Sequence, residues 1–225
     1  MNKLIVRELD QQEYKYILNR MIEFTDNRSA ETADEIWILQ HNSVFTQGKA
    51  GNDSFIMTPG DIPVIRADRG GHVTYHGPGQ ITAYILIDLK RAEMSVFELI
   101  SVIEKTVINT MSKWKVPGYT DRSARGVYCK SRKKIASIGL RVRRGCTYHG
   151  ISFNVDMDMS PWKSINACGL DLEMTQLKNE TSDYINFSDV LFTFKKELIK
   201  ELGYNDERAN IVAVSYTHLT LPTKA

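Results

Sequence analysis

The sequence predicts a domain of the α/β or α+β class, in which a mixed β-sheet is flanked by a few helices. Short apolar segments typical of strands alternate with segments whose apolar residues recur at helical spacing. Thr82–Leu89 is apolar almost throughout, which is typical of a central strand buried on both faces. No repeat, low-complexity stretch or linker divides the chain, and 225 residues are enough for one sizeable core.

The N-terminal half is expected to hold one helix among several strands. A helix is predicted over Gln11–Thr25 because apolar residues recur there at helical spacing, at Tyr14, Ile17, Leu18, Met21 and Ile22. Compact apolar segments on either side predict strands over Leu4–Leu9, Glu35–Gln40, Pro63–Arg66 and Thr82–Leu89.

The C-terminal half opens with a helix that carries its own start signal. Ser95 and Glu98 form a capping-box signature, and the apolar residues that follow share one face: Val96, Leu99, Ile100, Ile103, Val107 and Met111. Consecutive β segments are expected over Gly126–Cys129, Lys134–Arg143 and Tyr148–Val155, with a turn at 143–145. A closing helix is expected over Asn186–Leu202, with Val190, Leu191, Phe194 and Leu198 facing inward.

The composition excludes several classes of protein. Hydrophobic residues make up 42% and charged residues 25%, as in ordinary globular domains. No apolar run approaches the ~20 residues of a membrane helix, and the N-terminus lacks a signal-peptide cleavage site. Cys129, Cys146 and Cys168 are odd in number, widely spaced and without a CxxC pair, so neither a disulfide framework nor a zinc site is expected. These features favour a protein of the reducing cytoplasm.

The last twelve residues differ in composition from the rest of the chain. Val214–Ala225 (VSYTHLTLPTKA) resembles the in-frame translation of a sequencing-library adapter, although a genuine strand-like tail is the alternative. We therefore expect a single domain over residues 1–213, followed by a non-native tail over residues 214–225.

Charge is nearly balanced overall, at a formal +2, but it is unevenly placed. Nine basic residues and no acidic one lie between Arg122 and Arg144. Such a block suits an anionic partner, such as a nucleic acid, a phosphate or an acidic protein. The alternative is a solvated strand edge decorated with lysine and arginine.

A stretch rich in glycine and histidine, Arg69–Gln80, is the first candidate site. Four of its twelve residues are glycine, which allows a ligand to approach the backbone closely. A strand-like alternation would place His72, Thr74 and His76 on one face. Two histidines at this spacing could bind zinc, but no third ligand with suitable spacing is evident. By itself the stretch indicates either a ligand-binding loop or a set of turns.

Two further segments hold groups capable of covalent or acid–base chemistry. Lys134 enters a small, apolar strand (Lys133–Gly139), where partial burial would change its proton affinity; a solvated strand-edge lysine is the alternative. Cys168 precedes Gly169 in a loop that leaves a thiolate sterically open, whereas a buried structural cysteine is the common alternative. Cys129 and Cys146 are assigned to buried structural positions.

Taken together, these stretches resemble the octanoyltransferase family of lipoate biosynthesis, the lipoyl(octanoyl) transferases. The resemblance covers nearly all of the chain up to about Ala213. Four blocks occur in the family's order over a hundred residues: Arg69–Tyr84, Lys134-Ile-Ala136, Arg143–Gly150 with its Arg-Arg-Gly-Cys-x-x-His-Gly run, and Asn166-Ala-Cys-Gly169.

The resemblance implies a catalytic mechanism and its partners. Octanoyl would pass from acyl carrier protein to a specific lysine of a lipoyl domain, through a thioester on Cys168 that Lys134 assists as pKa-lowering partner and general base. Exchange between thioesters is nearly isoenergetic, so no metal, nucleotide or other cofactor is expected. The expected acceptors are the lipoyl-domain proteins of the 2-oxoacid dehydrogenases and of the glycine cleavage system. The basic block would attract the acidic carrier protein.

The resemblance also implies a fold and an acyl pocket. The fold would be that of the catalytic domain of biotin and lipoate protein ligases, a mixed sheet flanked by helices. The pocket would be lined by Arg69, Gly70, Gly71, His72, Val73, Thr74, Tyr75, His76, Ser137, Ile138, Gly139, Gly150, Ile151 and Ser152. Behind it would lie His149, Gly79, Gln80 and Tyr84. Backbone N–H groups there could stabilise an oxyanion, and neither His76 nor His149 is expected to be the base.

Other functions stay open on the sequence. An ATP-dependent lipoate or biotin protein ligase would share the fold but would need a nucleotide site and no cysteine nucleophile. A non-catalytic protein that binds acyl carrier protein or lipoyl domains would need neither Cys168 nor Lys134. A nucleic-acid-binding module is disfavoured, because the basic block lacks interleaved aromatic residues and the net charge is small.

Overall fold

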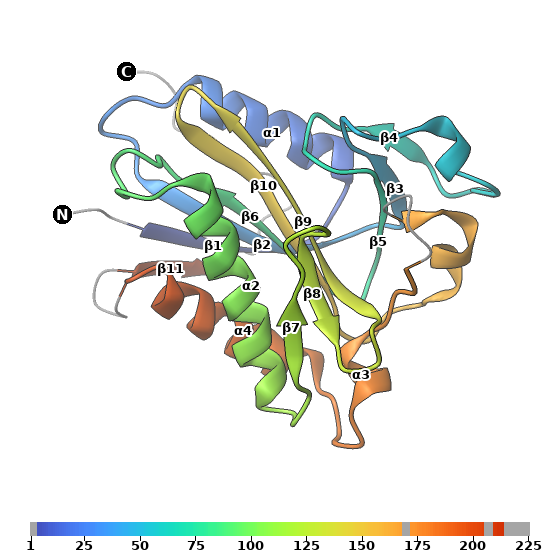
Figure 1. The fold of residues 1–225 in the computed structure, drawn as a ribbon. Coiled ribbons are helices and arrows are strands. Elements are labelled where there is room, and N and C mark those ends of the chain that lie inside the picture. The colour runs from blue at the N-terminus through green and yellow to red at the C-terminus, as the bar shows by residue number, and fades with distance from the viewer. Residues whose placement is uncertain (1–3, 168–171, 205–208, 214–225) are drawn as a thin grey trace.

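The computed structural model of the chain describes residues 4–167, 172–204 and 209–213. Within this part, eight strands form one mixed sheet in the order β11-β1-β2-β6-β10-β9-β8-β7 (Figure 1). Their bounds are β1 Leu4–Gln12, β2 Asp34–His41, β6 Gln80–Leu86, β7 Gly118–Thr120, β8 Gly126–Cys129, β9 Lys134–Arg143, β10 Cys146–Asn154 and β11 Ala209–Ala213. The β1–β2 and β1–β11 pairs are parallel, whereas the pairs from β2 through to β7 are antiparallel. The predicted mixed sheet with flanking helices is confirmed.

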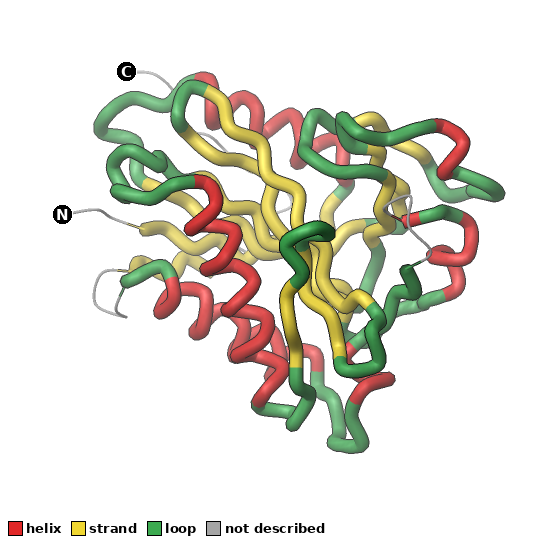
Figure 2. Tube along the Cα trace, viewed as in Figure 1, coloured by secondary structure: helices red, strands yellow, loops and turns green. Residues whose placement is uncertain are grey.

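A second, three-stranded sheet with the order β4-β3-β5 lies beside the large one (Figures 1 and 2). It is built from β3 Val44–Gln47, β4 Val64–Arg66 and β5 Val73–His76. Two 3-10 turns, Asp53–Phe55 and Ser160–Ser164, are distant in sequence but are joined by a bridge between Ile56 and Ile165, and the second packs near β5. This small sheet carries the glycine- and histidine-rich stretch.

Helices cover both faces of the large sheet. Helix α1 (Tyr14–Asp26) packs on one face, and helices α2 (Val96–Ser112) and α4 (Phe187–Glu201) lie side by side on the other; a short helix, α3 (Leu177–Glu180), lies nearby (Figure 1). Successive side chains of β2 point to opposite faces of the sheet, so apolar residues are available to pack against helices on both faces. Ile36 and Ile38 pack against α2 and α4, whereas Trp37 and Leu39 pack against α1.

Several predicted elements have the predicted bounds, and others differ in an informative way. Gly126–Cys129 and Lys134–Arg143 are strands as expected, the capping box of Ser95 and Glu98 starts α2, and Asn186 caps α4. The helix expected from Gln11 begins only at Tyr14. Gln11 and Gln12 instead extend β1 by pairing with Gln40 and His41 of β2. The strand expected to run to Leu89 ends at Leu86, and β10 begins at Cys146, two residues before the prediction.

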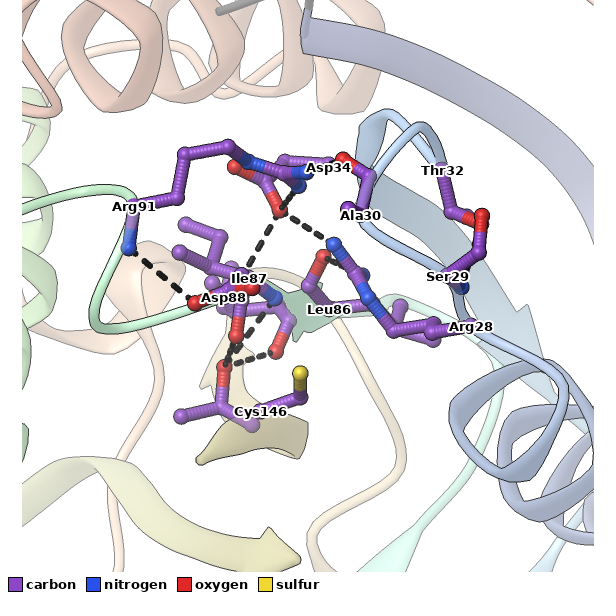
Figure 3. Close-up of polar contacts among 12 residues, drawn as sticks. Arg28, Ser29, Ala30, Thr32, Asp34, Leu86, Ile87, Asp88, Arg91 and Cys146 are labelled. Carbon is purple, nitrogen blue, oxygen red and sulfur yellow. Dashed lines mark hydrogen bonds and ion pairs between the residues drawn. The ribbon is translucent and has the colours of Figure 1, made fainter. Parts of the chain in front are cut away.

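A buried cluster of charges fixes the end of the sheet at β2 and β6 (Figure 3). Asp34, fully buried at the start of β2, accepts from Arg28 Nη2 at 2.5 Å and from Arg91 Nη2 at 2.6 Å. Arg28 Nη1 also donates to the carbonyl of Leu86 at the end of β6, and the N–H of Asp88 donates to Asp34. The Asp34 carboxylate therefore connects the start of β2 and the end of β6 with the two loops that carry Arg28 and Arg91.

Candidate functional site

A cavity of about 400 Å³ lies against β9 and β10 of the large sheet and the 69–76 segment of the small sheet. Most of the residues expected to form the pocket line it: Arg69, Gly70, Gly71, His72, Val73, Thr74, His76, Ser137, Ile138, Gly139, Gly150, Ile151 and Ser152. Lys134 lines it as well, and so do His149 and Tyr84, which were expected to lie behind it. That these residues bind substrate stays a prediction.

Of the residues expected to line the cavity, Tyr75 does not reach it, and Gly79 and Gln80, which were expected behind it, do not line it. The ring of Tyr75 instead packs on Phe45 and Trp162 in a buried cluster. Gly79 and Gln80 lie at the turn into β6, and the Gln80 side chain supports the cavity through His76. Conversely, His72, Thr74 and His76 all line the cavity, as their predicted common face requires.

Some lining residues were not recognised in the sequence as site residues. They are Tyr14, Thr82, Val96, Ile100, Ser123, Ala124, Arg125 and Leu140. Val96 and Ile100 carry the signal of a core helix face, and at the N-terminal end of α2 that face borders the cavity instead. The loop before β8 supplies Ser123, Ala124 and Arg125, whose residue types give no sequence signal for a pocket.

Arg69 is buried and holds the small sheet together at the cavity wall. Its guanidinium donates to the carbonyl of Thr46 at 2.7 Å and to Thr46 Oγ1 at 2.8 Å, and to the carbonyl of Gly70 at 2.9 Å. These contacts tie the 69–71 turn to β3, so the glycine-rich backbone is fixed where it faces the cavity.

His76 is neutral and its tautomer is set by its neighbours. Burial lowers its pKa well below the usual range. Nδ1 lies 2.8 Å from Gln80 Oε1 and donates to it, and Nε2 lies 3.3 Å from Thr46 Oγ1 and accepts from it. Both ring nitrogens of His76 are therefore engaged in hydrogen bonds, and its exclusion as the base stays a prediction.

His41 was not recognised in the sequence, yet it belongs to the same buried aromatic group. Its Nε2 lies 2.6 Å from the hydroxyl of Tyr84, and its ring contacts those of Tyr14 and His76 at centroid distances of 5.1 and 5.7 Å. Burial lowers the pKa of His41 to about 4 and raises that of Tyr84 well above 10. All of these groups are therefore uncharged at neutral pH.

His149 adopts a backbone conformation that residues other than glycine rarely take, with φ at 59°. Its Nε2 donates to Asp68 Oδ1 at 2.9 Å, and the Tyr148 hydroxyl donates to the other oxygen of the same carboxylate. Burial disfavours the Asp68 charge, but these two hydrogen bonds overcome it and lower the pKa of Asp68 to about 2. With Nε2 protonated, Nδ1 is an acceptor, and it is buried with no hydrogen-bond partner among the described residues.

Lys134 is buried at the start of β9, with 3% of its surface exposed, so the alternative of a solvated strand-edge lysine is excluded. Its Nζ donates to the carbonyl of Arg125 at 2.8 Å and lies 5.5 Å from the centre of the Tyr128 ring. Its backbone pairs with the segment that follows residue 171: Lys134 N donates to the carbonyl of Glu173, and Thr175 N donates to the carbonyl of Lys134, both at 2.8 Å.

Cys168 lies outside the described residues, but the chain on both sides of it is described. Ala167, directly before it, is buried in a cluster with Val73 and Trp162, and Met174 packs against the same cluster. Val73 lines the cavity, and Met174 is bridged to Lys134. Ala167 therefore lies in the same cluster as the lining residue Val73, and Met174 lies beside Lys134.

The two described cysteines lie in non-reactive settings. Cys129 is fully buried in β8, and burial raises the pKa of its thiol to about 12. Cys146 is buried at the start of β10, where burial also raises its pKa (Figure 3). Both agree with the assignment to structural positions, because the thiolate is the nucleophilic form.

The basic block of the sequence does not form one patch. It runs along β9, whose ten residues span roughly 30 Å. Arg143 and Arg144 contact Asp26 at the C-terminal end of α1, whereas Arg125 lies at the cavity, 3.9 Å from Glu104. Two members of the block, Arg125 and Lys134, line the cavity and are placed to meet a ligand that enters there.

Two features are absent from residues 4–167, 172–204 and 209–213. In those ranges no three His, Cys, Asp or Glu side chains are grouped to hold a metal ion. Across the same part of the chain, no helix has the length and apolar character needed to cross a bilayer.

Comparison with known proteins gives consistent results. A family model described as "Lipoyl protein ligase A/B catalytic domain" matches residues 13–199. An octanoyltransferase of Shewanella denitrificans is 49% identical over 207 residues, covering 90% of this chain and 89% of its own. Among solved structures, a bipartite lipoate protein ligase and its E2 lipoyl domain from Thermoplasma acidophilum gives a TM-score of 0.72 at 11% identity, covering 96% and 88%. A biotin protein ligase of Aquifex aeolicus gives 0.53 at 14%, covering 90% and 70%. The ligase-like fold implied by the sequence resemblance is thus confirmed.

Proposed function

We propose that the protein is an octanoyltransferase of lipoate biosynthesis, since the chain belongs to the family of lipoyl protein ligase A/B catalytic domains. The relative at 49% identity carries that name, and its match extends over 90% of this chain. The observation that carries the mechanism is the buried Lys134, which lines the cavity and pairs with the segment following Cys168.

In the first step, the thiolate of Cys168 attacks the thioester carbonyl carbon of octanoyl-acyl carrier protein. A bond forms from sulfur to carbon, the carrier's thiolate leaves, and the proton it needs comes from the Lys134 ammonium. The product is an octanoyl thioester on Cys168. No oxidant, nucleotide or metal takes part in this exchange.

In the second step, the amine of a lysine on a lipoyl domain attacks the same carbonyl carbon. Lys134, left neutral by the first step, accepts the proton that this amine loses, and the Cys168 thiolate departs. An amide is more stable than a thioester, so this step makes the transfer favourable. The buried position of Lys134 supports the dual role, because the amine is held in a fixed place by the Arg125 carbonyl.

The cavity is suited to a medium acyl chain. Its apolar wall is made by side chains of β9, β10 and α2, namely Ile138, Leu140, Ile151, Val96 and Ile100. His76, Tyr14 and Tyr84 at its inner wall are uncharged, so an alkyl chain can pack against them without burying an ion. We assign acyl carrier protein as the donor and a lipoyl domain as the acceptor. Arg125, which lines the cavity, would meet the acidic carrier there.

An ATP-dependent lipoate ligase is the second candidate, favoured by the likeness in fold to the Thermoplasma ligase. The two functions differ in one requirement. A ligase must activate a free acid with ATP, whereas the proposed transferase uses a thioester that is already activated.

A transfer assay separates the two candidates. The protein is incubated with octanoyl-acyl carrier protein and an unmodified lipoyl domain without ATP, and the mass of the lipoyl domain is measured. We expect octanoylated lipoyl domain with the wild-type protein and with Cys129→Ala, but none with Cys168→Ala. Modification only from free octanoate and ATP would contradict the proposal and identify a ligase.

A further inference from the structure

We propose that Glu104, a residue of α2 that does not line the cavity, positions Lys134 by holding the peptide group between Arg125 and Gly126. The proposal rests on the proposed function, since it gives Glu104 a part in the same reaction.

Glu104 and Lys134 hold the two sides of one peptide group. The Gly126 N–H donates to Glu104 Oε1 at 3.2 Å, and the carbonyl of Arg125, on the other side of the same planar unit, accepts from Lys134 Nζ at 2.8 Å. A carboxylate at the N–H polarises the peptide and strengthens its carbonyl as an acceptor. The direction in which Lys134 Nζ is held therefore depends on Glu104.

The setting of Glu104 is unusual for a packing residue. It is buried, with 4% of its surface exposed, and its helix neighbours Ile103 and Val107 fill the hydrophobic core. Burial raises the pKa of the Glu104 carboxyl, and the Gly126 N–H, Arg125 and Lys134 act in the opposite direction. The groups that favour the Glu104 carboxylate are thus Lys134 itself and the two residues, Arg125 and Gly126, that share the peptide group in question.

Glycine at position 126 is required by the same arrangement. Its φ is +137°, which L side chains rarely adopt, and a Cβ built there would lie 2.5 Å from Lys134 Cε and 2.5 Å from the Ala136 carbonyl oxygen. The peptide can lie flat against the Lys134 side chain only because no side chain separates them.

Among the described residues, further charged and titratable groups around the pair come from the 121–125 loop and from β8. Arg125 Nη1 lies 3.9 Å from Glu104 Oε2, and the Tyr128 ring lies 5.5 Å from Lys134 Nζ. Asp121 is near enough for the positive charge of Lys134 to contribute to lowering its pKa, after its contacts with Ser123. These groups bound the amine from the loop and the strand, while Glu104 acts from the helix.

The test compares kcat and KM of ATP-free octanoyl transfer in Glu104→Leu and Glu104→Gln, expressed per folded molecule. Glu197→Leu is the matched control: Glu197 is another buried helix carboxylate, but its contacts go to Lys200 and Asn109. We expect Glu104→Leu to lose about tenfold or more in kcat with KM for both substrates unchanged, because a misplaced reacting group slows the step without weakening binding. Glu104→Gln keeps an oxygen for the Gly126 N–H and should restore most of the activity. Glu197→Leu should keep the wild-type kcat.

Three results would overturn the inference: wild-type kcat in Glu104→Leu, an equal loss in Glu197→Leu, or no recovery in Glu104→Gln. If Glu104→Leu does not fold, Gly126→Ala disturbs the same peptide from its other neighbour, and wild-type kcat in that variant would overturn the inference equally. Failure of the proposed function is distinct, because the wild-type protein would then show no ATP-free transfer at all.

Discussion

Asp34→Asn is expected to lower the free energy of unfolding by about 3–5 kcal/mol, the usual cost of breaking a buried ion pair. Asp34 is fully buried, and its two cationic partners, Arg28 and Arg91, are 4% and 22% exposed in their side chains. Asparagine has nearly the same shape and can still accept from the N–H of Asp88, so the loss comes from the charge. The Arg28 guanidinium would keep the Leu86 carbonyl and the amide oxygen at position 34 as acceptors, but it would remain buried without a counter-charge.

Urea unfolding followed by tryptophan fluorescence measures this loss. The midpoint should fall while the slope of free energy against urea stays constant, and the thermal midpoint should fall by roughly 6–20 °C. Asp53→Asn is the control, because the Asp53–Arg66 pair is 73% and 78% exposed and its removal should have no measurable effect. Equal, small effects of the two substitutions would refute the idea that burial gives the Asp34 cluster its importance.

Three further predictions concern the cavity. Lys134→Ala should lower the rate of octanoyl transfer by about 10²–10⁴ without changing the circular dichroism spectrum, whereas Lys133→Ala next to it should stay active; similar rates for both would contradict the proton-transfer role. The buried His41, with a pKa of about 4 against 6.5 when unfolded, binds fewer protons in the folded state, so stability should fall as pH drops from 6.5 to 4. His41→Gln should reduce that slope by up to about 1.4 kcal/mol per pH unit, and an unchanged slope in urea titrations would disprove it. Gly150→Ala should destabilise the fold by about 1–3 kcal/mol, because its Cβ would lie 2.1 Å from the Ala83 carbonyl oxygen; an unchanged urea midpoint would show that β6 and β10 can separate there.

The elements that the sequence predicted well are those with a local signal of their own. The capping box at Ser95 starts α2, and the alternation over Lys134–Arg143 gives β9 with its bounds. Strands β3, β7 and β11 have three to five residues, too few for a periodicity to be recognised, and they exist because longer neighbours pair with them. The predicted start of the first helix, at Gln11, was wrong for a related reason: pairing with β2 keeps Gln11 and Gln12 extended.

The candidate site was predictable where residue type and spacing carry chemistry. The common face of His72, Thr74 and His76 follows from strand alternation, whereas the sequence left Lys134 open between partial burial and a solvated strand edge, and the structure buries it. Neither the hydrogen bond from Lys134 to the Arg125 carbonyl nor the one from the Gly126 N–H to Glu104 could be predicted, because both depend on how α2 lies against β8. His41 could not be predicted either, since its partner Tyr84 is 43 residues away and pairs with it only across the sheet.

The proposed thioester on Cys168 is the central step of the mechanism, and one measurement tests it directly. The protein is mixed with octanoyl-acyl carrier protein alone, without ATP or lipoyl domain, and its intact mass is recorded. One octanoyl group should be added, should be released by hydroxylamine, and should be absent in Cys168→Ala but retained in Cys129→Ala and Cys146→Ala. Folded wild-type protein that transfers octanoyl to a lipoyl domain and yet shows no such adduct would contradict the covalent mechanism.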